Sequence, residues 1–190
     1  KYGVAFSESQ IDLDTLFSKK QPIVMEIGYG MGEATWQIAK ANPDINYIGV
    51  EVHMPGAGKL MAKLAEHEIT NVRLIERDVF EVFHYMVKDA SLDGAHLFFP
   101  DPWPKKRHFK RRIIQERFLS EVAAKLKPGG YLHIATDWVP YAEWITEVFS
   151  RTNLFTGGVI ARPDWRPLTR FEGQGISKDH AVNDFRYLKV

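Results

Sequence analysis

Acidic side chains close three successive apolar runs in the first half of the chain. Glu26 precedes the glycine-rich turn Gly28-Tyr29-Gly30-Met31-Gly32, Glu51 ends the second run, and Asp78 follows the third. If these runs are parallel strands, their carboxyl ends share one edge of a sheet, where ligands bind in open α/β folds. Glycines in the first turn permit a close approach of the backbone to such a ligand. The pattern therefore predicts a binding site lined by carboxylates.

The spacing of these residues narrows the choice of ligand. The dinucleotide fingerprint G-x-G-x-x-G needs a glycine at position 33, where this chain has Glu33. Glu51 lies nineteen residues beyond Gly32, where doubly wound folds place a carboxylate on the two ribose hydroxyls. Plainer roles stay open for the other two acids: Glu26 could be a solvated carboxylate at a strand end, and Asp78 could cap the following helix.

A stiff acidic turn and a basic segment follow one another in the middle of the chain. Prolines flank Asp101 in Pro100-Asp101-Pro102-Trp103-Pro104, and they restrict the backbone that carries this carboxylate. The next eight residues (105–112, the basic segment) include no acid. Its six cations are Lys105, Lys106, Arg107, Lys110, Arg111 and Arg112. Such a run neutralises phosphates without reading base sequence, although a solvated surface is the alternative interpretation.

The elements that must position these groups alternate along residues 22–150. Strands are expected at 22–27, 46–51, 71–76, 94–99 and 131–136, and helices at 33–41, 56–68, 79–87, 111–126 and 138–150. Two further strands, at 155–160 and 184–190, follow this alternation. The pattern predicts an α/β fold: a doubly wound, mostly parallel seven-stranded sheet with helices on both faces and an antiparallel C-terminal end. We expect residues 1–190 to form a single domain, with an N-terminal arm of uncertain order at 1–21.

Composition removes several classes of protein. The chain has 190 residues, no cysteine and a formal net charge of +1, which excludes thiolate catalysis and cysteine-based metal sites and suits a cytoplasmic location. No run of about 18 apolar residues occurs, and residues 1–20 lack the apolar core of a signal peptide, so we expect neither a membrane span nor a leader. The seven histidines form no H-x-x-x-H pair, and we expect no metal.

The motifs together resemble a known family. An acid before G-x-G-x-G resembles the first motif of class I S-adenosylmethionine-dependent methyltransferases, in which Glu26 would reach the methionine ammonium of the cofactor. Pro100-Asp101-Pro102-Trp103, the basic segment and Thr136-Asp137-Trp138 are similar to the tRNA (guanine-N7)-methyltransferase family. Thr169-Arg170-Phe171-Glu172 resembles the last motif of that family, and the likeness covers nearly the whole chain.

The resemblance implies S-adenosyl-L-methionine as cofactor, tRNA as partner, and transfer of a methyl group to N7 of guanosine 46 in the variable loop. It implies cofactor contacts for Glu26, Gly28, Gly30, Gly32, Glu51, Asp78 and Asp101. Asp101 is also the implied catalytic residue. Substrate contacts are implied for Lys105, Asp137, Thr169, Arg170, Phe171 and Glu172, and contacts to the RNA backbone are expected from Lys106, Arg107, Lys110, Arg111 and Arg112.

Two rival functions remain open at this point. Asp101-Pro102-Trp103 is similar to the D-P-P-[YFW] motif of enzymes that methylate exocyclic amines, but the second proline of that motif is missing. A non-catalytic RNA-binding protein with the same fold is a different class, against which the three acidic strand ends argue. The oligomeric state is left open between a monomer and a homodimer.

Overall fold

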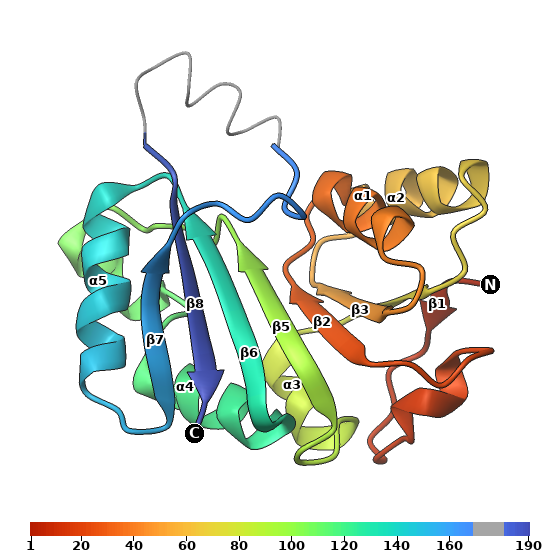
Figure 1. The fold of residues 1–190 in the computed structure, drawn as a ribbon, viewed down its shortest axis with the longest axis horizontal. Helices are drawn as coiled ribbons and strands as arrows, with labels where there is room; N and C mark the ends of the chain where they lie inside the picture. The colour runs from red at the N-terminus through yellow and green to blue at the C-terminus, as the bar shows by residue number, and fades with distance from the viewer. Residues whose placement is uncertain (169–180) are drawn as a thin grey trace.

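A computed structural model describes residues 1–168 and 181–190, and the strands of this part of the chain form one eight-stranded sheet (Figure 1). The strands are β1 (Gly3–Val4), β2 (Ile23–Ile27), β3 (Asn46–Glu51), β4 (Val72–Glu76), β5 (Leu92–Phe98), β6 (Leu126–Thr136), β7 (Phe155–Ile160) and β8 (Asn183–Lys189). Their spatial order is β1-β4-β3-β2-β5-β6-β8-β7. Only β8 runs antiparallel to its neighbours, β6 and β7.

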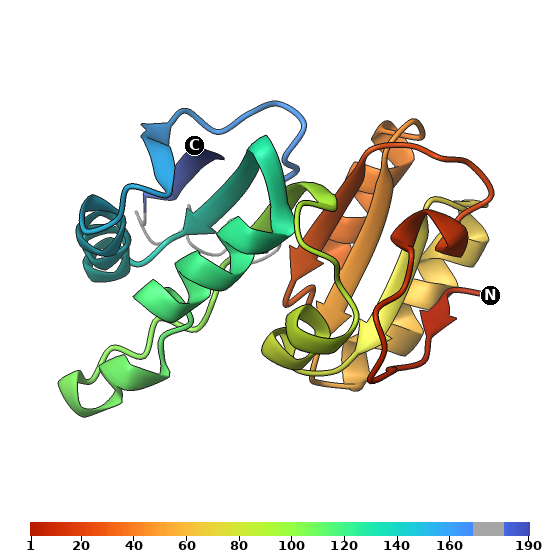
Figure 2. The same ribbon diagram turned by 90° about the horizontal axis from the view of Figure 1, so that it is seen from below.

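Helices cover both faces of this sheet. They are α1 (Glu33–Ala41), α2 (Pro55–Glu66), α3 (Val79–Tyr85), α4 (Glu116–Lys125) and α5 (Val139–Ser150), with short 3-10 helices η1 (Leu13–Leu16) and η2 (Lys106–Arg111). Side chains alternate along each strand, so one apolar cluster lies under α1 and α2 and another under α3, α4 and α5. Figure 2 shows α4 and η2 extending away from the sheet on one side.

The order of the strands reverses between β2 and β5. The chain runs outward from β2 through β3 to β4, returns to place β5 on the other side of β2, and continues to β6. Ligands in open α/β sheets bind outside the carboxyl ends of the strands at such a switch point. Residues that follow β2 and β5 are therefore the first to consider for a functional site.

The predicted fold class is confirmed, with three differences in detail. The sheet has eight strands, not seven, because Gly3–Val4 in the N-terminal arm pairs in parallel with β4. The helix expected from residue 111 begins at Glu116, and residues 106–111 form η2 instead. Strand β6 begins at Leu126, earlier than the expected residue 131. Among the described residues, no helix is both long enough and apolar enough to span a bilayer.

Candidate functional site at the carboxyl edge of the sheet

The glycine-rich turn after β2 packs closely against the start of α2. Gly28, Gly30 and Gly32 all have positive φ, at 73°, 54° and 75°. Gly32 is the N-cap of α1, and a Cβ at this position would meet the Leu60 side chain at 2.7 Å. A Cβ at Gly56 would overlap the carbonyl oxygen of Gly30. The turn therefore needs glycine at its own positions, where φ is positive, and at Gly56 in α2, where a side chain would collide with the turn.

Glu26 is a buried carboxylate one residue before the end of β2. Only 4% of the residue is exposed. Burial raises the pKa of Glu26 to about 7; the negative charge of Glu51 adds to this rise, and interaction with the Thr35 side chain opposes it. The solvated strand-end interpretation is therefore wrong for Glu26. A carboxylate whose charge is costly in the protein alone is suited to pair with a cationic ligand group.

Glu51 ties the end of β3 to the glycine-rich turn. Its Oε2 accepts a hydrogen bond from the Gly30 N–H at 2.9 Å, and its Oε1 accepts from the N–H groups of Val52 and His53 at 2.8 and 3.2 Å. Each carboxylate oxygen has more than one acceptor site, so these bonds fix the carboxylate and leave capacity for hydroxyl donors.

Asp78 lies two residues beyond β4 and caps α3. Its Oδ1 accepts hydrogen bonds from the N–H groups of Phe80 and Glu81, at 2.9 and 3.4 Å. The alternative reading as an N-cap is thus confirmed. Because the cap uses Oδ1, it fixes the direction of the side chain and leaves Oδ2 outside these two bonds.

The turn that carries Asp101 follows β5 on the other side of the switch point. Asp101 is exposed. Two bulky residues bracket it in the left-handed region of φ, Phe99 at 50° and Trp103 at 42°. Such conformations cost about 1–2 kcal/mol each and persist where surrounding contacts hold them, often at functional sites. The strain in this turn was not detectable from its sequence, which shows only the prolines.

The other predicted substrate contacts lie along the same edge or outside the described residues. Asp137 directly follows β6 and is partly exposed, and Lys105 is exposed at the start of η2. The Thr136 hydroxyl accepts a hydrogen bond from the Trp138 N–H at 3.3 Å, which shapes the backbone around Asp137. Thr169, Arg170, Phe171 and Glu172 lie outside the described residues.

The basic segment divides into an exposed part and one buried residue. Lys106, Arg107, Lys110 and Arg111 are exposed, and the Arg111 guanidinium lies 4.9 Å from the centre of the Trp103 ring. Arg112 is only 3% exposed, so its assignment to the RNA backbone requires correction. Its Nε donates a hydrogen bond to the Pro102 carbonyl at 2.8 Å.

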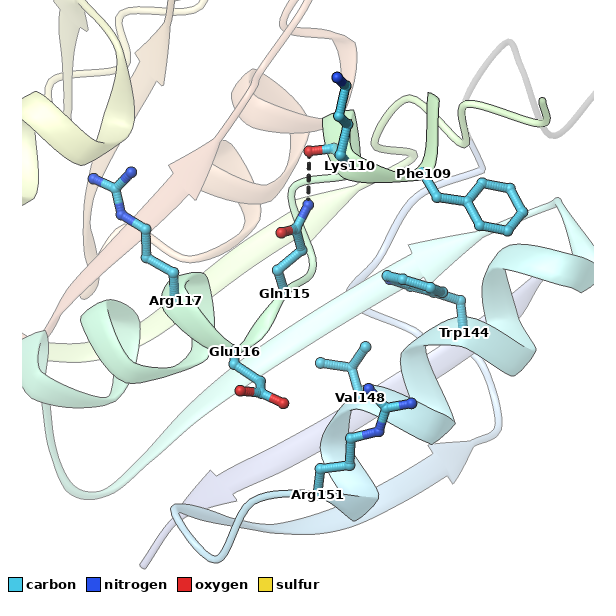
Figure 3. A pocket seen from close by; sticks show the side chains of 8 residues that line it. All are labelled: Phe109, Lys110, Gln115, Glu116, Arg117, Trp144, Val148 and Arg151. Atoms are coloured by element: carbon cyan, nitrogen blue, oxygen red, sulfur yellow. Dashed lines mark hydrogen bonds between the residues drawn. The ribbon is translucent and has the colours of Figure 1, made fainter. Parts of the chain in front are cut away.

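A separate pocket lies between η2, the start of α4 and α5 (Figure 3). Its volume is about 280 Å³, and it is lined by Phe109, Lys110, Gln115, Glu116, Arg117, Trp144, Val148 and Arg151. The rings of Phe109 and Trp144 lie side by side with their centres 5.7 Å apart. None of the acidic residues predicted to bind a cofactor lines this pocket.

Sequence reasoning missed a buried polar cluster over β6 and β8. Arg166 is fully buried and donates from Nε and Nη2 to the two carboxylate oxygens of Asp184, at 2.6 and 2.8 Å. The His133 Nε2 lies 2.7 Å from Asp184 Oδ1, and the Trp165 ring stacks on His96 with centres 5.0 Å apart. The sequence contains little sign of it: His133 lies within the apolar part of β6, but Arg166 is in a loop and Asp184 is in a strand with several polar residues. Among the described residues, no group of three or more His, Asp and Glu side chains is placed to hold a metal ion.

Comparison with known proteins identifies the family. A family model described as "Putative methyltransferase" matches residues 20–185. The tRNA (guanine-N(7)-)-methyltransferase of Chromobacterium violaceum is 50% identical over 187 residues, covering 97% of this chain and 83% of the relative. That of Methylobacillus flagellatus is 47% identical, covering 96% and 79%. The chain belongs to the tRNA (guanine-N7)-methyltransferase family. The resemblance seen in the sequence motifs is thus confirmed.

Solved structures with low sequence identity share the fold of this family member. The 16S rRNA methyltransferase KamB superimposes with a TM-score of 0.65 at 15% identity, covering 93% of this chain and 91% of that one. An rRNA methylase from Streptococcus thermophilus gives 0.61 at 19% identity, covering 90% and 87%. These matches show a class I methyltransferase fold and nothing finer.

Proposed function

We propose that this protein transfers a methyl group from S-adenosyl-L-methionine to N7 of guanosine 46 in the variable loop of tRNA, forming 7-methylguanosine. One observation carries the proposal. Relatives named tRNA (guanine-N(7)-)-methyltransferase have sequences 45–50% identical to this one across nearly the whole chain. The carboxylates on both sides of the topological switch point supply the matching chemistry, because β2 carries Glu26 and the turn after β5 carries Asp101.

The residues at this edge fit the cofactor. Burial raises the pKa of Glu26 to about 7, so an ammonium group beside it would stabilise the ionised carboxylate. We assign the ribose hydroxyls to Glu51, which the turn already fixes, and the adenine amine to Asp78. The backbone of Gly28, Gly30 and Gly32 would pass close to the ligand, since no Cβ stands in the way.

The chemistry asks the protein for alignment more than for proton transfer. When bound, S-adenosyl-L-methionine supplies an electrophilic methyl group on a sulfonium. Guanine N7 has a lone pair and no proton in nucleic acids, so a general base has little to remove. Asp101 then orients the guanine by accepting from its N1 and N2 hydrogens, or offsets the migrating positive charge. Well-oriented groups contribute about 7 kcal/mol or more to lowering a barrier.

The RNA contacts in this proposal come in part from the same edge. Lys105 and Asp137 lie there and would contact the guanosine and its nucleotide, and we expect the same contacts from Thr169, Arg170, Phe171 and Glu172, which are outside the described residues. The four other exposed cations of the basic segment, Lys106, Arg107, Lys110 and Arg111, would neutralise phosphates, which holds tRNA without reading its base sequence. We further propose that residues 1–190 act as one methyltransferase domain in the cytoplasm, as a monomer or a homodimer.

The direct test is product analysis. Unmodified tRNA transcript is incubated with the protein and methyl-labelled cofactor, digested, and separated into nucleosides. We expect label in 7-methylguanosine, and loss of label with a transcript that has adenosine at position 46. Label on an exocyclic amino nitrogen would contradict the reaction, whereas 7-methylguanosine from the position-46 variant would contradict the site on tRNA. Cofactor binding without transfer to any nucleoside would favour the non-catalytic reading.

A further inference from the structure

Arg112 is the last cation of the basic segment, yet it faces the protein interior. The residue is 3% exposed, while Lys110 and Arg111 directly before it are exposed. Its backbone leaves η2 with φ −61° and ψ 132°, an extended conformation that sends the chain back toward the core before α4 begins. A phosphate of bound RNA cannot reach a guanidinium in this position without displacing protein groups.

Three aromatic rings surround the Arg112 guanidinium. Its central carbon lies 3.8 Å from the centre of the Phe109 ring, 5.0 Å from Trp144 and 5.2 Å from Tyr141. Tyr141 and Trp144 belong to α5, and their polar groups bond back to the chain beside Arg112: Trp144 Nε1 donates to the Ile114 carbonyl at 2.7 Å. Cation–π contacts with three rings offset part of the cost of burying this charge.

Arg112 also contacts the turn that carries Asp101. Its Nε–H donates to the carbonyl of Pro102, the residue directly after Asp101, at 2.8 Å. Prolines at 100, 102 and 104 have no backbone N–H. The backbone of this turn therefore has few donors, and most hydrogen bonds that fix it must be accepted by its carbonyl groups. The strained φ angles of Phe99 and Trp103 also need surrounding contacts to persist.

We propose that Arg112 is a positioning residue for methyl transfer, which fixes Asp101 through the Pro102 carbonyl and does not contact tRNA. The proposal rests on the proposed function, since it assigns the role of Asp101 to a defined geometry. The aromatic rings from η2 and α5 fix the position of the Arg112 guanidinium. The guanidinium then fixes the turn that carries Asp101 through its hydrogen bond to the Pro102 carbonyl. A misplacement of about 1 Å in an aligned site can cost about 100-fold in rate.

The test separates rate from RNA affinity in two variants. Arg112→Lys keeps the charge but loses the planar Nε–H donor, and Arg112→Met keeps the volume and loses both. We expect kcat to fall by about 10-fold in the first and about 100-fold in the second. The dissociation constants for tRNA and S-adenosylhomocysteine should stay within about 2-fold of wild type, and the salt dependence of tRNA binding should not change.

The matched control is Lys106→Met, an exposed cation of the same segment. This variant should affect RNA affinity and not the rate. We expect weaker tRNA binding, a KM effect larger than any kcat effect, and a slope of log K against log salt that is shallower by about 0.7–0.9. If Arg112→Lys behaves like this control, Arg112 is a phosphate contact and the proposal is overturned. Full kcat in both Arg112 variants overturns it equally.

Coupling to Asp101 keeps the proposal testable if Arg112→Met folds poorly. In the Asp101→Asn background, Arg112→Lys should cause less than about a 2-fold further loss, because residues that act as a unit are not additive. A full 10-fold further loss would show that Arg112 does not act through Asp101. Wild-type protein is assayed for 7-methylguanosine in parallel: no product there contradicts the proposed function itself, whereas a normal wild type with uncoupled variants contradicts only the role of Arg112.

Discussion

Arg166 and Asp184 form a buried two-armed ion pair that joins the segments on either side of residues 169–180. Arg166 Nε lies 2.6 Å from Oδ1 and Nη2 lies 2.8 Å from Oδ2. His133 on β6 shares Oδ1 at 2.7 Å, so the pair is also fixed to the sheet. Residues 161–168 are thereby held over the ends of β5 and β6, next to the edge where Asp101 and Asp137 lie (Figure 1).

The first prediction concerns the stability that this pair provides. Asp184→Asn removes the carboxylate charge that pairs with the fully buried Arg166 guanidinium, and breaking one side of such a pair costs about 3–5 kcal/mol. Urea unfolding should show this loss as a lower midpoint. Glu121→Gln, which breaks the exposed i,i+4 pair with Arg117, serves as the control and should change stability by about 0.5 kcal/mol or less. Equal effects of the two substitutions would contradict the assigned importance of burial.

The second prediction follows from Glu26, whose pKa burial raises to about 7 from 4.5. Between these values the folded state binds a proton on Glu26 that the unfolded state has released, so stability falls as pH rises from about 4.5 to 7. Above about pH 7 the Glu26 contribution is constant. Glu26→Gln should remove this slope and stabilise the cofactor-free protein at pH 8 by about 3 kcal/mol. Urea unfolding at pH 5, 6.5 and 8 measures the slope in both proteins.

The third prediction uses the same group to test the cofactor site. If the cofactor ammonium pairs with Glu26, binding should release close to one proton per site at pH 6 and almost none from this group at pH 8.5. Titration calorimetry with S-adenosylhomocysteine in buffers of different ionisation enthalpy measures the released protons. Glu26→Gln should lose the proton release together with most of the affinity. Release that persists in this variant would assign the ammonium to another carboxylate.

Local sequence predicted the strands and the acidic edge because both depend on short-range patterns. Buried parallel strands show as apolar runs, and a carboxylate after each run shows where the run ends. The fate of Arg112 needed information from further along the chain. Its partners Tyr141 and Trp144 lie about thirty residues away on α5, so a run of six cations gave no sign that the last one is buried. Likewise, a two-residue edge strand such as β1 is too short for any alternation to be seen.

The same limit explains the shifted start of α4 and the missed Arg166–Asp184 pair. Lysine and arginine favour helices, which made residues 111–115 look helical. In the structure Arg112 is extended because its side chain turns inward to the Pro102 carbonyl. Asp184 and Arg166 are eighteen residues apart and meet only once β8 pairs with β6. Tertiary contacts decided both cases.

The fourth prediction concerns the chemical role of Asp101. If Asp101 orients guanine and takes no proton, Asp101→Asn should lower the single-turnover rate by about 100-fold without changing the shape of its pH profile. A true general base would instead give an acid limb in the wild-type profile. Rapid-quench assays from pH 4 to 9 with saturating tRNA measure both proteins. An acid limb that is present in wild type and absent from the Asn variant would make Asp101 a base.

The fifth prediction concerns the four exposed cations of the basic segment that follow Lys105: Lys106, Arg107, Lys110 and Arg111. If about four of them neutralise phosphates, log K for tRNA binding should fall with log salt with a slope of about −3 to −4. Lys106→Glu should weaken tRNA binding at least about 10-fold and reduce the slope, with little change in cofactor affinity. Lys88→Glu makes the same charge change before β5, at the opposite edge of the sheet, and should have a much smaller effect. Equal losses in these two variants would indicate that net charge, not the position of the basic segment beside Asp101, determines the affinity for tRNA.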